Sequence, residues 1–319
     1  MHYRTSTYKR LATPLKWLIA AGVLYLVFKQ VNTDRLLEAL ASARIEMYIP
    51  LAVCFVILWF LIESQNLMYL FNMFGHPVTF REMRLIRGAS YMLMIINYNL
   101  GLGAIAWYLK QRNSIPLVRA SSVMFFYYFV ESVGITFFAM VGCLLILGQS
   151  PAVYTKIVAI AGCMFSAYII LFFILRFLPD KGYFKRFRNN EIMASFYEVT
   201  FPDYFKLSGL RAIYFASFIV FFYFGLKCFN VNVPLLYLTG LVPVIFFIGN
   251  IPITPFGIGT IQAAMVFFFK DFGPEENILS FSVVYSATLL FFRAPIGLFY
   301  MRNTHTGLKD IQIMGMESS

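Results

Sequence analysis

The chain has 319 residues, of which 60% are hydrophobic, 19% aromatic and 13% charged, and its formal net charge is +11. With several apolar runs of about 20 residues, this composition is that of a polytopic membrane protein. The basic residues collect in loops and at the termini, as orientation signals do, which excludes a nucleic-acid-binding face. The histidines and cysteines lack the spacing of a metal site, so we expect no cofactor.

Six segments are apolar and long enough to cross a bilayer. The first follows a basic cluster and has no small-residue cleavage site after it, so we expect a retained span rather than a signal peptide. The predicted spans cover 15–31, 48–72, 118–147, 153–178, 208–228 and 278–301. They predict an all-α polytopic membrane protein whose single transmembrane domain covers 1–319.

Two further apolar segments, 88–109 and 234–269, have awkward lengths. The second is too long for one crossing and too short for two, and prolines and glycines interrupt it at Asn250–Gln262. Irregular backbone at membrane depth is tolerated only against protein or a water-filled cavity. We therefore predict a hairpin of two short arms, the alternative being a proline kink repaired by neighbouring helices. The segment 88–109 is either one full span or a second, shorter hairpin.

The distribution of charge favours two hairpins. If the N-terminus is cytoplasmic and neither segment crosses, most Lys and Arg residues fall on the cytoplasmic side. This predicts cytoplasmic termini and two re-entrant hairpins that enter from opposite faces, as in an inverted repeat of halves 1–150 and 151–319. Between the halves, 181–206 interleaves aromatics with cations and is either an interfacial segment in the headgroup layer or an ordinary basic cytoplasmic loop.

Three ionisable residues, Glu63, Glu131 and Arg293, lie within the predicted spans. A charge at this depth faces the protein interior and needs a partner. In one interpretation Arg293 forms an ion pair with one of the glutamates. In the other, Arg293 binds a phosphate or carboxylate, for which its planar fork is suited, while the glutamates gate the path or hold protons.

The hairpin tips offer backbone donors to the same anion. A helix that restarts after Pro255 would present the amides of Gly257 and Gly259, and the first hairpin would present those of Gly101 and Gly103. The alternative is that these glycines permit close helix packing. Polar residues at the tips complete the predicted substrate-binding set: Asn97, Asn99, Asn250, Thr254 and Gln262.

The segment Pro252–Gln262 is similar to the motif P-x-T-P-G-G-x-G-x-x-E of the lysylphosphatidylglycerol synthase transmembrane region family, which includes the flippase half of the multiple peptide resistance factor. An early family motif resembles Asn97–Gly103, and Glu131 and Arg293 resemble a glutamate and an arginine of the family. Here Phe256 replaces a glycine and Gln262 a glutamate, so a proton or cation role of that glutamate does not carry over. We expect no aminoacyl-transferase domain of the kind found in full-length resistance factors. The resemblance therefore implies lipid translocation without lipid aminoacylation.

These observations predict a bacterial or archaeal inner-membrane protein, and not an enzyme, that moves a phospholipid or other polar lipid between leaflets. Its site would lie between the hairpin tips. The expected partners are membrane lipids with anionic headgroups, and further candidates are a second copy of the chain and a lipid-modifying enzyme. Two alternatives stay open: a membrane enzyme that transfers a group to or from a lipid carrier through acidic loop residues, and an accessory protein that docks such an enzyme through 181–206.

Overall fold

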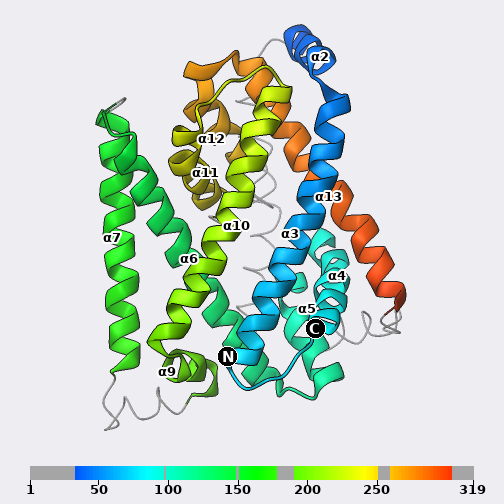
Figure 1. Ribbon diagram of the computed structural model, residues 1–319, viewed down its shortest axis with the longest axis vertical. Helices are drawn as coiled ribbons and strands as arrows, with labels where there is room; N and C mark the ends of the chain where they lie inside the picture. Colours follow the sequence, from blue (N-terminus) through cyan, green and yellow to red (C-terminus); the bar gives the residue numbers. More distant parts are fainter. Residues whose placement is uncertain (1–32, 97, 149–150, 178–189, 251–258, 304–319) are drawn as a thin grey trace, which may run out of the picture. The chain divides into compact units, whose positions relative to one another are not determined.

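The computed structural model describes residues 33–96, 98–148, 151–177, 190–250 and 259–303, and helices make up almost all of them (Figure 1). The helices are α2 (Thr33–Ser42), α3 (Ile45–Met73), α4 (Phe80–Ile96), α5 (Tyr98–Asn113), α6 (Leu117–Leu145), α7 (Pro151–Arg176), η1 (Glu191–Met193), α9 (Ala194–Glu198), α10 (Phe201–Cys228), α11 (Leu235–Asn250), α12 (Thr260–Phe269), η3 (Lys270–Phe272) and α13 (Glu275–Asn303).

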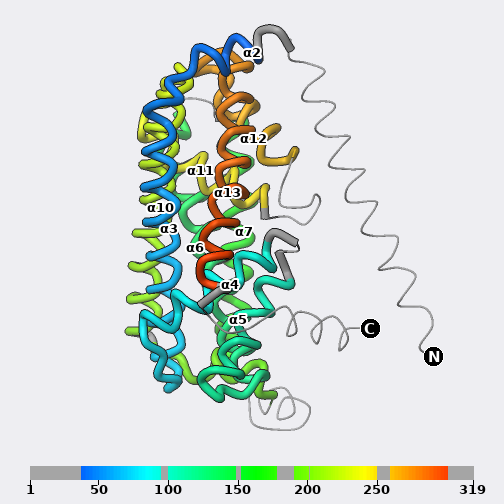
Figure 2. The backbone as a smooth tube through the Cα atoms, turned by 90° about the vertical axis from the view of Figure 1, so that its right-hand side faces the viewer, coloured from blue at the N-terminus to red at the C-terminus, as the bar shows by residue number. Residues whose placement is uncertain are grey.

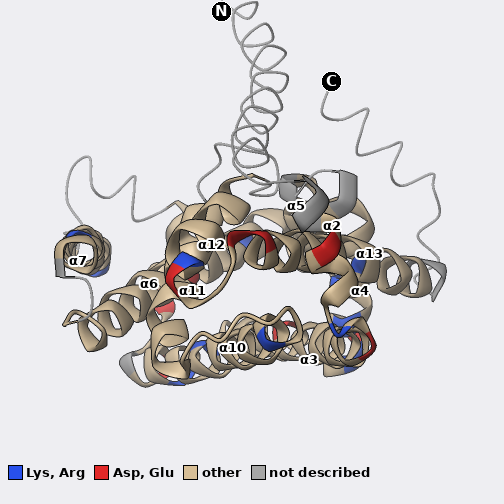
Figure 3. Ribbon diagram, turned by 90° about the horizontal axis from the view of Figure 1, so that it is seen from above, with Lys and Arg blue, Asp and Glu red and all other residues tan. Residues whose placement is uncertain are grey.

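Five of the described helices are long and apolar enough to cross a membrane: Ile45–Met73, Leu117–Leu145, Ala152–Arg176, Pro202–Cys228 and Glu275–Tyr300. They match five of the six predicted spans, and the remaining one, 15–31, lies outside the described residues. Charged residues occupy only short stretches of these helices (Figure 3). The predicted all-α, polytopic class is confirmed.

The segment 88–109 forms parts of two short helices instead of one span. α4 and α5 lie side by side and are joined at residue 97 (Figures 1 and 2). α4 begins at Phe80 because a capping box starts it: Glu82 Oε2 accepts from the Thr79 backbone N–H at 2.8 Å, and Thr79 Oγ1 accepts from the Glu82 N–H at 3.3 Å. That this pair re-enters the membrane from one face stays a prediction.

The segment 234–269 is likewise divided into two short helices, α11 and α12, as its prolines and glycines predicted. α12 begins after Gly259, whose φ of 88° favours glycine. The two helices also approach closely, since a Cβ on Gly249 would lie 2.8 Å from Ile261 Cγ1. The intervening residues 251–258 lie outside the described part of the chain.

The chain divides into two compact units, each built from three stretches. The first unit contains 1–52, 135–165 and 215–288, and the second contains 53–134, 166–214 and 289–319. Helices α3, α6, α7, α10 and α13 contribute residues to both. This division differs from the sequence halves 1–150 and 151–319.

Aromatic side chains from α3, α10 and α13 form the core of the first unit. Tyr48 packs edge-on against Phe229, with ring centroids 5.5 Å apart, and its hydroxyl lies 3.0 Å from Thr288 Oγ1. The apolar ring of Tyr48 is buried, and its hydroxyl has a hydrogen-bond partner, as is usual for a buried tyrosine. These contacts fix the three helices against one another within this unit.

Within the first unit, α6 and α11 meet backbone to backbone. A Cβ added to Gly142 would lie 2.2 Å from Gly240 Cα, and one added to Gly240 would lie 2.6 Å from the Gly142 carbonyl carbon. Small residues of this kind allow close approach of membrane helices, where dispersion contacts and weak hydrogen bonds replace the hydrophobic effect as the attraction. Neither position has room for a side chain.

In the second unit, glycines let α4 pack tightly against α5 and the end of α13. A Cβ on Gly101 would lie 2.1 Å from Met94 Cγ, and one on Gly88 would lie 2.3 Å from Tyr300 Cδ2. Gly101 thus has a packing role in addition to the predicted binding role. This contact holds the two helices of the α4–α5 pair together.

Part of the basic segment 181–206 is packed protein. Residues 181–189 lie outside the described part of the chain, but the short helix α9 lies against α6. Ser195 Oγ is 2.9 Å from Ser122 Oγ, and the Phe196 ring packs edge-on against Phe126 at 5.2 Å. The α9 portion is therefore anchored to the second unit through buried side chains.

Candidate functional site

The second unit buries ionisable side chains from four helices. Glu63 on α3, Arg87 on α4 and Arg211 on α10 are each no more than 5% exposed, and Glu131 lies on α6. An unpaired buried charge costs several kcal/mol, on the order of 3–5 when one member of a pair is lost. The partners of these groups therefore decide what the site can do.

Glu63 is fully engaged by donors from α4. Its Oε2 accepts from Arg87 Nη2 at 2.7 Å, from Arg87 Nε at 3.0 Å and from the Tyr91 hydroxyl at 3.0 Å. Charge-assisted bonds of this kind are the strong ones, because donor and acceptor are both ionised. The Glu63 carboxylate is thus satisfied from within the protein.

Arg211 and Glu131 form a looser pair. Arg211 Nη2 lies 3.8 Å from Glu131 Oε2, which is an ion-pair distance but too long for a hydrogen bond. The guanidinium carbon instead lies over the Tyr127 ring, 4.0 Å from its centroid. Both terminal nitrogens of Arg211 are buried without a hydrogen-bond acceptor. This pair has unused hydrogen-bonding capacity.

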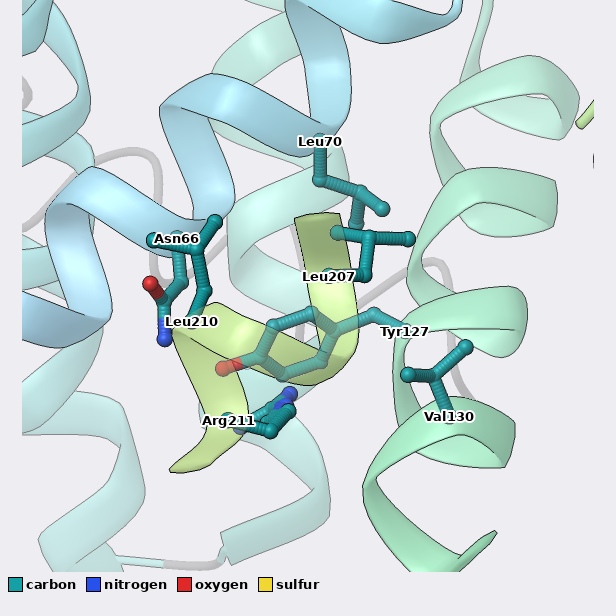
Figure 4. A pocket seen from close by; sticks show the side chains of 7 residues that line it. All are labelled: Asn66, Leu70, Tyr127, Val130, Leu207, Leu210 and Arg211. Carbon is teal, nitrogen blue, oxygen red and sulfur yellow. The ribbon is translucent and has the colours of Figure 1, made fainter. Parts of the chain in front are cut away.

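A small cavity, lined mainly by apolar side chains, adjoins Arg211 (Figure 4). Its volume of about 10 Å³ is close to that needed for one water molecule. Asn66 is 3% exposed, and neither its Oδ1 nor its Nδ2 has a hydrogen-bond partner. The polar ends of Asn66, Tyr127 and Arg211 lie close together in Figure 4. The lining residues are Asn66, Leu70, Tyr127, Val130, Leu207, Leu210 and Arg211.

Arg293, on α13, contacts aromatic rings instead of a carboxylate. Its guanidinium carbon lies 4.9 Å from the Trp59 ring centroid and 5.7 Å from that of Tyr91. Its Nε is buried without an acceptor, and no ion pair joins it to an Asp or Glu in the described part of the chain. Among the described residues, the ion-pair partners of Glu63 and Glu131 are Arg87 and Arg211, and the predicted role of Arg293 stays a prediction.

One predicted amide donor is used within the protein. In the first unit the Gly259 N–H donates to Gln262 Oε1 at 2.7 Å, and Gln262 Nε2 donates to Ser286 Oγ at 2.8 Å. A headgroup would have to displace Gln262 to reach this amide. In the second unit α5 begins at Tyr98, so Gly103 lies beyond the first four N–H groups, which alone lack intrahelical partners, whereas Gly101 is the fourth residue of the helix. A free amide is therefore not expected at Gly103, and the role of the Gly101 amide stays a prediction.

The remaining predicted tip residues lie outside the described part of the chain. These are Asn97, Thr254, Gly257 and the side chains of Asn99 and Asn250. Their roles stay predictions.

The family model for the lysylphosphatidylglycerol synthase TM region matches residues 15–297. The chain belongs to this family. No curated protein matches the chain. Membership confirms the predicted resemblance and makes the chain a multi-pass membrane protein of a lipid-related family.

In this family member, sequence reasoning missed two central residues. The charge count that predicts orientation treats Arg87 and Arg211 like any other Lys or Arg residue, but both are buried. Helical phase is the signal that could have found them, because side chains three or four residues apart share a helix face. Arg87 lies in phase with buried Met83 and Tyr91, and Arg211 with buried Leu207 and Phe215.

The described residues of this lysylphosphatidylglycerol synthase family chain contain no group of three His, Cys, Asp or Glu side chains that could hold a metal ion. Its buried charged groups form two arginine–glutamate pairs, and Arg293 lies against aromatic rings. Such an arrangement can bind an anion and hold or exchange protons.

Proposed function

We propose that this protein moves a lipid with an anionic headgroup between the leaflets of a bacterial or archaeal inner membrane, and that Arg293 binds the headgroup. The observation that carries the proposal is the buried Nε of Arg293, which faces no acceptor although the cation lies in a membrane-spanning helix. An anionic ligand would supply that acceptor.

The charge balance of the second unit supports an anion at this position. Glu63 neutralises Arg87, and Glu131 neutralises Arg211, so the charge of Arg293 has no counterpart among the described ion pairs. A cation at the centre of a membrane helix costs about 2.5–3.5 kcal/mol on insertion scales. A phosphate would offset this cost, and the planar fork of arginine matches two phosphate oxygens.

The aromatic contacts support a binding role over a purely structural one. The rings of Trp59 and Tyr91 stabilise the guanidinium through its positive charge, by about 0.5–2 kcal/mol, without providing an oxygen acceptor. Tyr91 also donates its hydroxyl to Glu63, which fixes the orientation of its ring. The cation is thus held in place while its N–H groups keep capacity for a ligand.

Family membership supports a lipid as the ligand, because the matching model describes the membrane region of a lipid-modifying synthase. Re-entrant hairpins and cytoplasmic termini remain parts of the proposal, with alternating exposure to the two leaflets as the mechanism. The proposal does not require chemistry on the lipid itself.

The test is headgroup translocation in proteoliposomes that contain a fluorescent short-chain phosphatidylglycerol. Reduction of the fluorophore by an impermeant reagent reports the outer leaflet. We expect Arg293→Ala to lower the translocation rate at least tenfold, since a charge-assisted hydrogen bond contributes about 1.5–3 kcal/mol. The translocation rate of Arg293→Lys should lie between those of wild type and Arg293→Ala, because lysine keeps the positive charge but lacks the planar guanidinium fork.

The matched control is Lys110→Gln, which removes an exposed cation at the end of α5 in the same unit. It should translocate lipid at the wild-type rate. If folded Arg293→Ala protein also did so, Arg293 would not be the headgroup-binding residue.

A further inference from the structure

We propose that Glu131 is the carboxylate that takes up and releases a proton as the lipid binds and leaves, and that a water molecule bound between Asn66, Tyr127 and Arg211 hydrogen-bonds to the Arg211 guanidinium in both states. The inference rests on the proposed function and adds its regulation by protons. It separates the roles of the two buried glutamates, which sequence alone left equivalent.

The first step is the contrast in hydrogen bonding. Glu63 Oε2 receives three donors at 2.7–3.0 Å, two of them from a buried guanidinium. Protonation of Glu63 would break this cluster of hydrogen bonds around a carboxylate of a residue that is 5% exposed. Glu131 lies 3.8 Å from Arg211 and forms no hydrogen bond with it, so it can accept a proton without breaking such a bond.

The second step is the cavity beside Arg211. Its volume is close to that of one water molecule, and its lining residues include Arg211 and Asn66, each of which has two buried polar atoms without a hydrogen-bond partner. A water molecule can accept from Arg211 and from Asn66 Nδ2 and donate to Asn66 Oδ1. A halide cannot donate, so it would leave Asn66 Oδ1 unsatisfied. The donor and acceptor set therefore selects water.

The groups around Glu131 define the charge change. Arg211 and Tyr214 face it from α10, Glu63 from α3 and Arg87 from α4, and Tyr127 lies one turn away on α6. A hydronium ion gives a proton to a Glu131 carboxylate oxygen, which leaves a water molecule and a neutral carboxylic acid. The Glu131–Arg211 pair changes from net zero to +1.

The third step joins this charge to the lipid. An added positive charge in the second unit favours an anion at Arg293, and linkage makes the effect reciprocal, so binding of the anion favours proton uptake. One linked proton changes the affinity by at most tenfold per pH unit. Loss of the proton from Glu131 later in the transport cycle weakens binding at Arg293 and releases the lipid.

The experiment measures binding of fluorescent short-chain phosphatidylglycerol to the full chain in phosphatidylcholine nanodiscs between pH 5 and pH 9. For wild type we expect the affinity to rise as the pH falls, with a slope of up to tenfold per pH unit over part of this range. Glu131→Gln should bind with an affinity independent of pH and close to the low-pH wild-type value. Glu63→Gln should keep the pH dependence.

A second measurement does not depend on the variant folding. Acidification of wild-type protein should produce an infrared band of a protonated carboxylic acid, and Glu131→Asp should shift this band. Binding by Arg293→Ala distinguishes the headgroup role of Arg293 from the proton role of Glu131. If Arg293→Ala binds the lipid like wild type, the proposed function fails. If it does not bind while Glu131→Gln retains the wild-type pH dependence, or if no band appears, only the proton inference fails.

Discussion

The buried pair between Glu63 and Arg87 predicts a large coupling energy in a double-mutant cycle. The variants are Glu63→Met, Arg87→Met and the double variant, which replace the charged groups by apolar side chains of similar length. Both charges are at most 5% exposed, and Arg87 contacts Glu63 through two nitrogens. Each single variant leaves the other charge buried and unpaired.

The expected magnitudes follow from this geometry. Charges about 4 Å apart at an effective dielectric constant of about 20 attract by about 4 kcal/mol. Loss of one partner of a buried pair costs about 3–5 kcal/mol, whereas replacing both by apolar groups is often neutral or stabilising. The double variant should therefore be more stable than either single variant, with a coupling energy of at least about 2 kcal/mol.

The assay is reversible unfolding of the full chain in mixed micelles with increasing dodecyl sulfate, followed by circular dichroism. Tyr91→Phe is the matched control, because it removes one hydroxyl donor to Glu63 and leaves the ion pair intact. It should cost about 1–3 kcal/mol, as expected for an unsatisfied charged acceptor. Additive single-variant losses would refute the claim that Glu63 and Arg87 stabilise each other.

Two further predictions concern helix packing and capping. Gly142→Leu should destabilise the fold by about 3 kcal/mol or more in the same unfolding assay, because its Cβ would meet the Gly240 backbone at 2.2 Å; an unchanged midpoint would contradict this close approach. The backbone and hydroxyl of Thr79 donate to Glu82 and lower the pKa of that carboxyl. The Glu82 carboxylate therefore stabilises the fold above its pKa in the unfolded chain, which is about 4.3. This stabilisation is lost as the pH falls through the lower pKa of Glu82 in the folded protein. Amide exchange in the first turn of α4 should increase on this acidification, and should not change in Glu82→Gln protein.

The membrane-spanning helices could be predicted because long apolar runs carry most of the information about them. The break between α11 and α12 could also be predicted, since Pro and Gly act locally on the backbone. The start of α5 was harder: Gly101 and Gly103 were expected to present free amides at a hairpin tip, but the helix begins at Tyr98 and Gly101 packs against Met94.

The partners of the charged residues could not be predicted from the sequence. Glu63, Glu131 and Arg293 were identified by their depth, but pairing depends on which helices become neighbours in space. Charge counting along the chain did not single out Arg87 and Arg211, because it ignores the helix face on which a residue lies. Gln262 was expected at a binding tip, and its contact with Ser286 requires the packing of α12 on α13.

The two arginine–glutamate pairs have different consequences for insertion during synthesis. Arg87 follows Glu63 by 24 residues on the next helix, so its charge can enter the bilayer together with its counterion. Arg211 lies on α10, and all of α7 is made between it and Glu131. The carboxyl group of Glu131 is therefore in the membrane or the translocon, without its ion-pair partner, until Arg211 is synthesised. A neutral, protonated form is the least costly state for that interval.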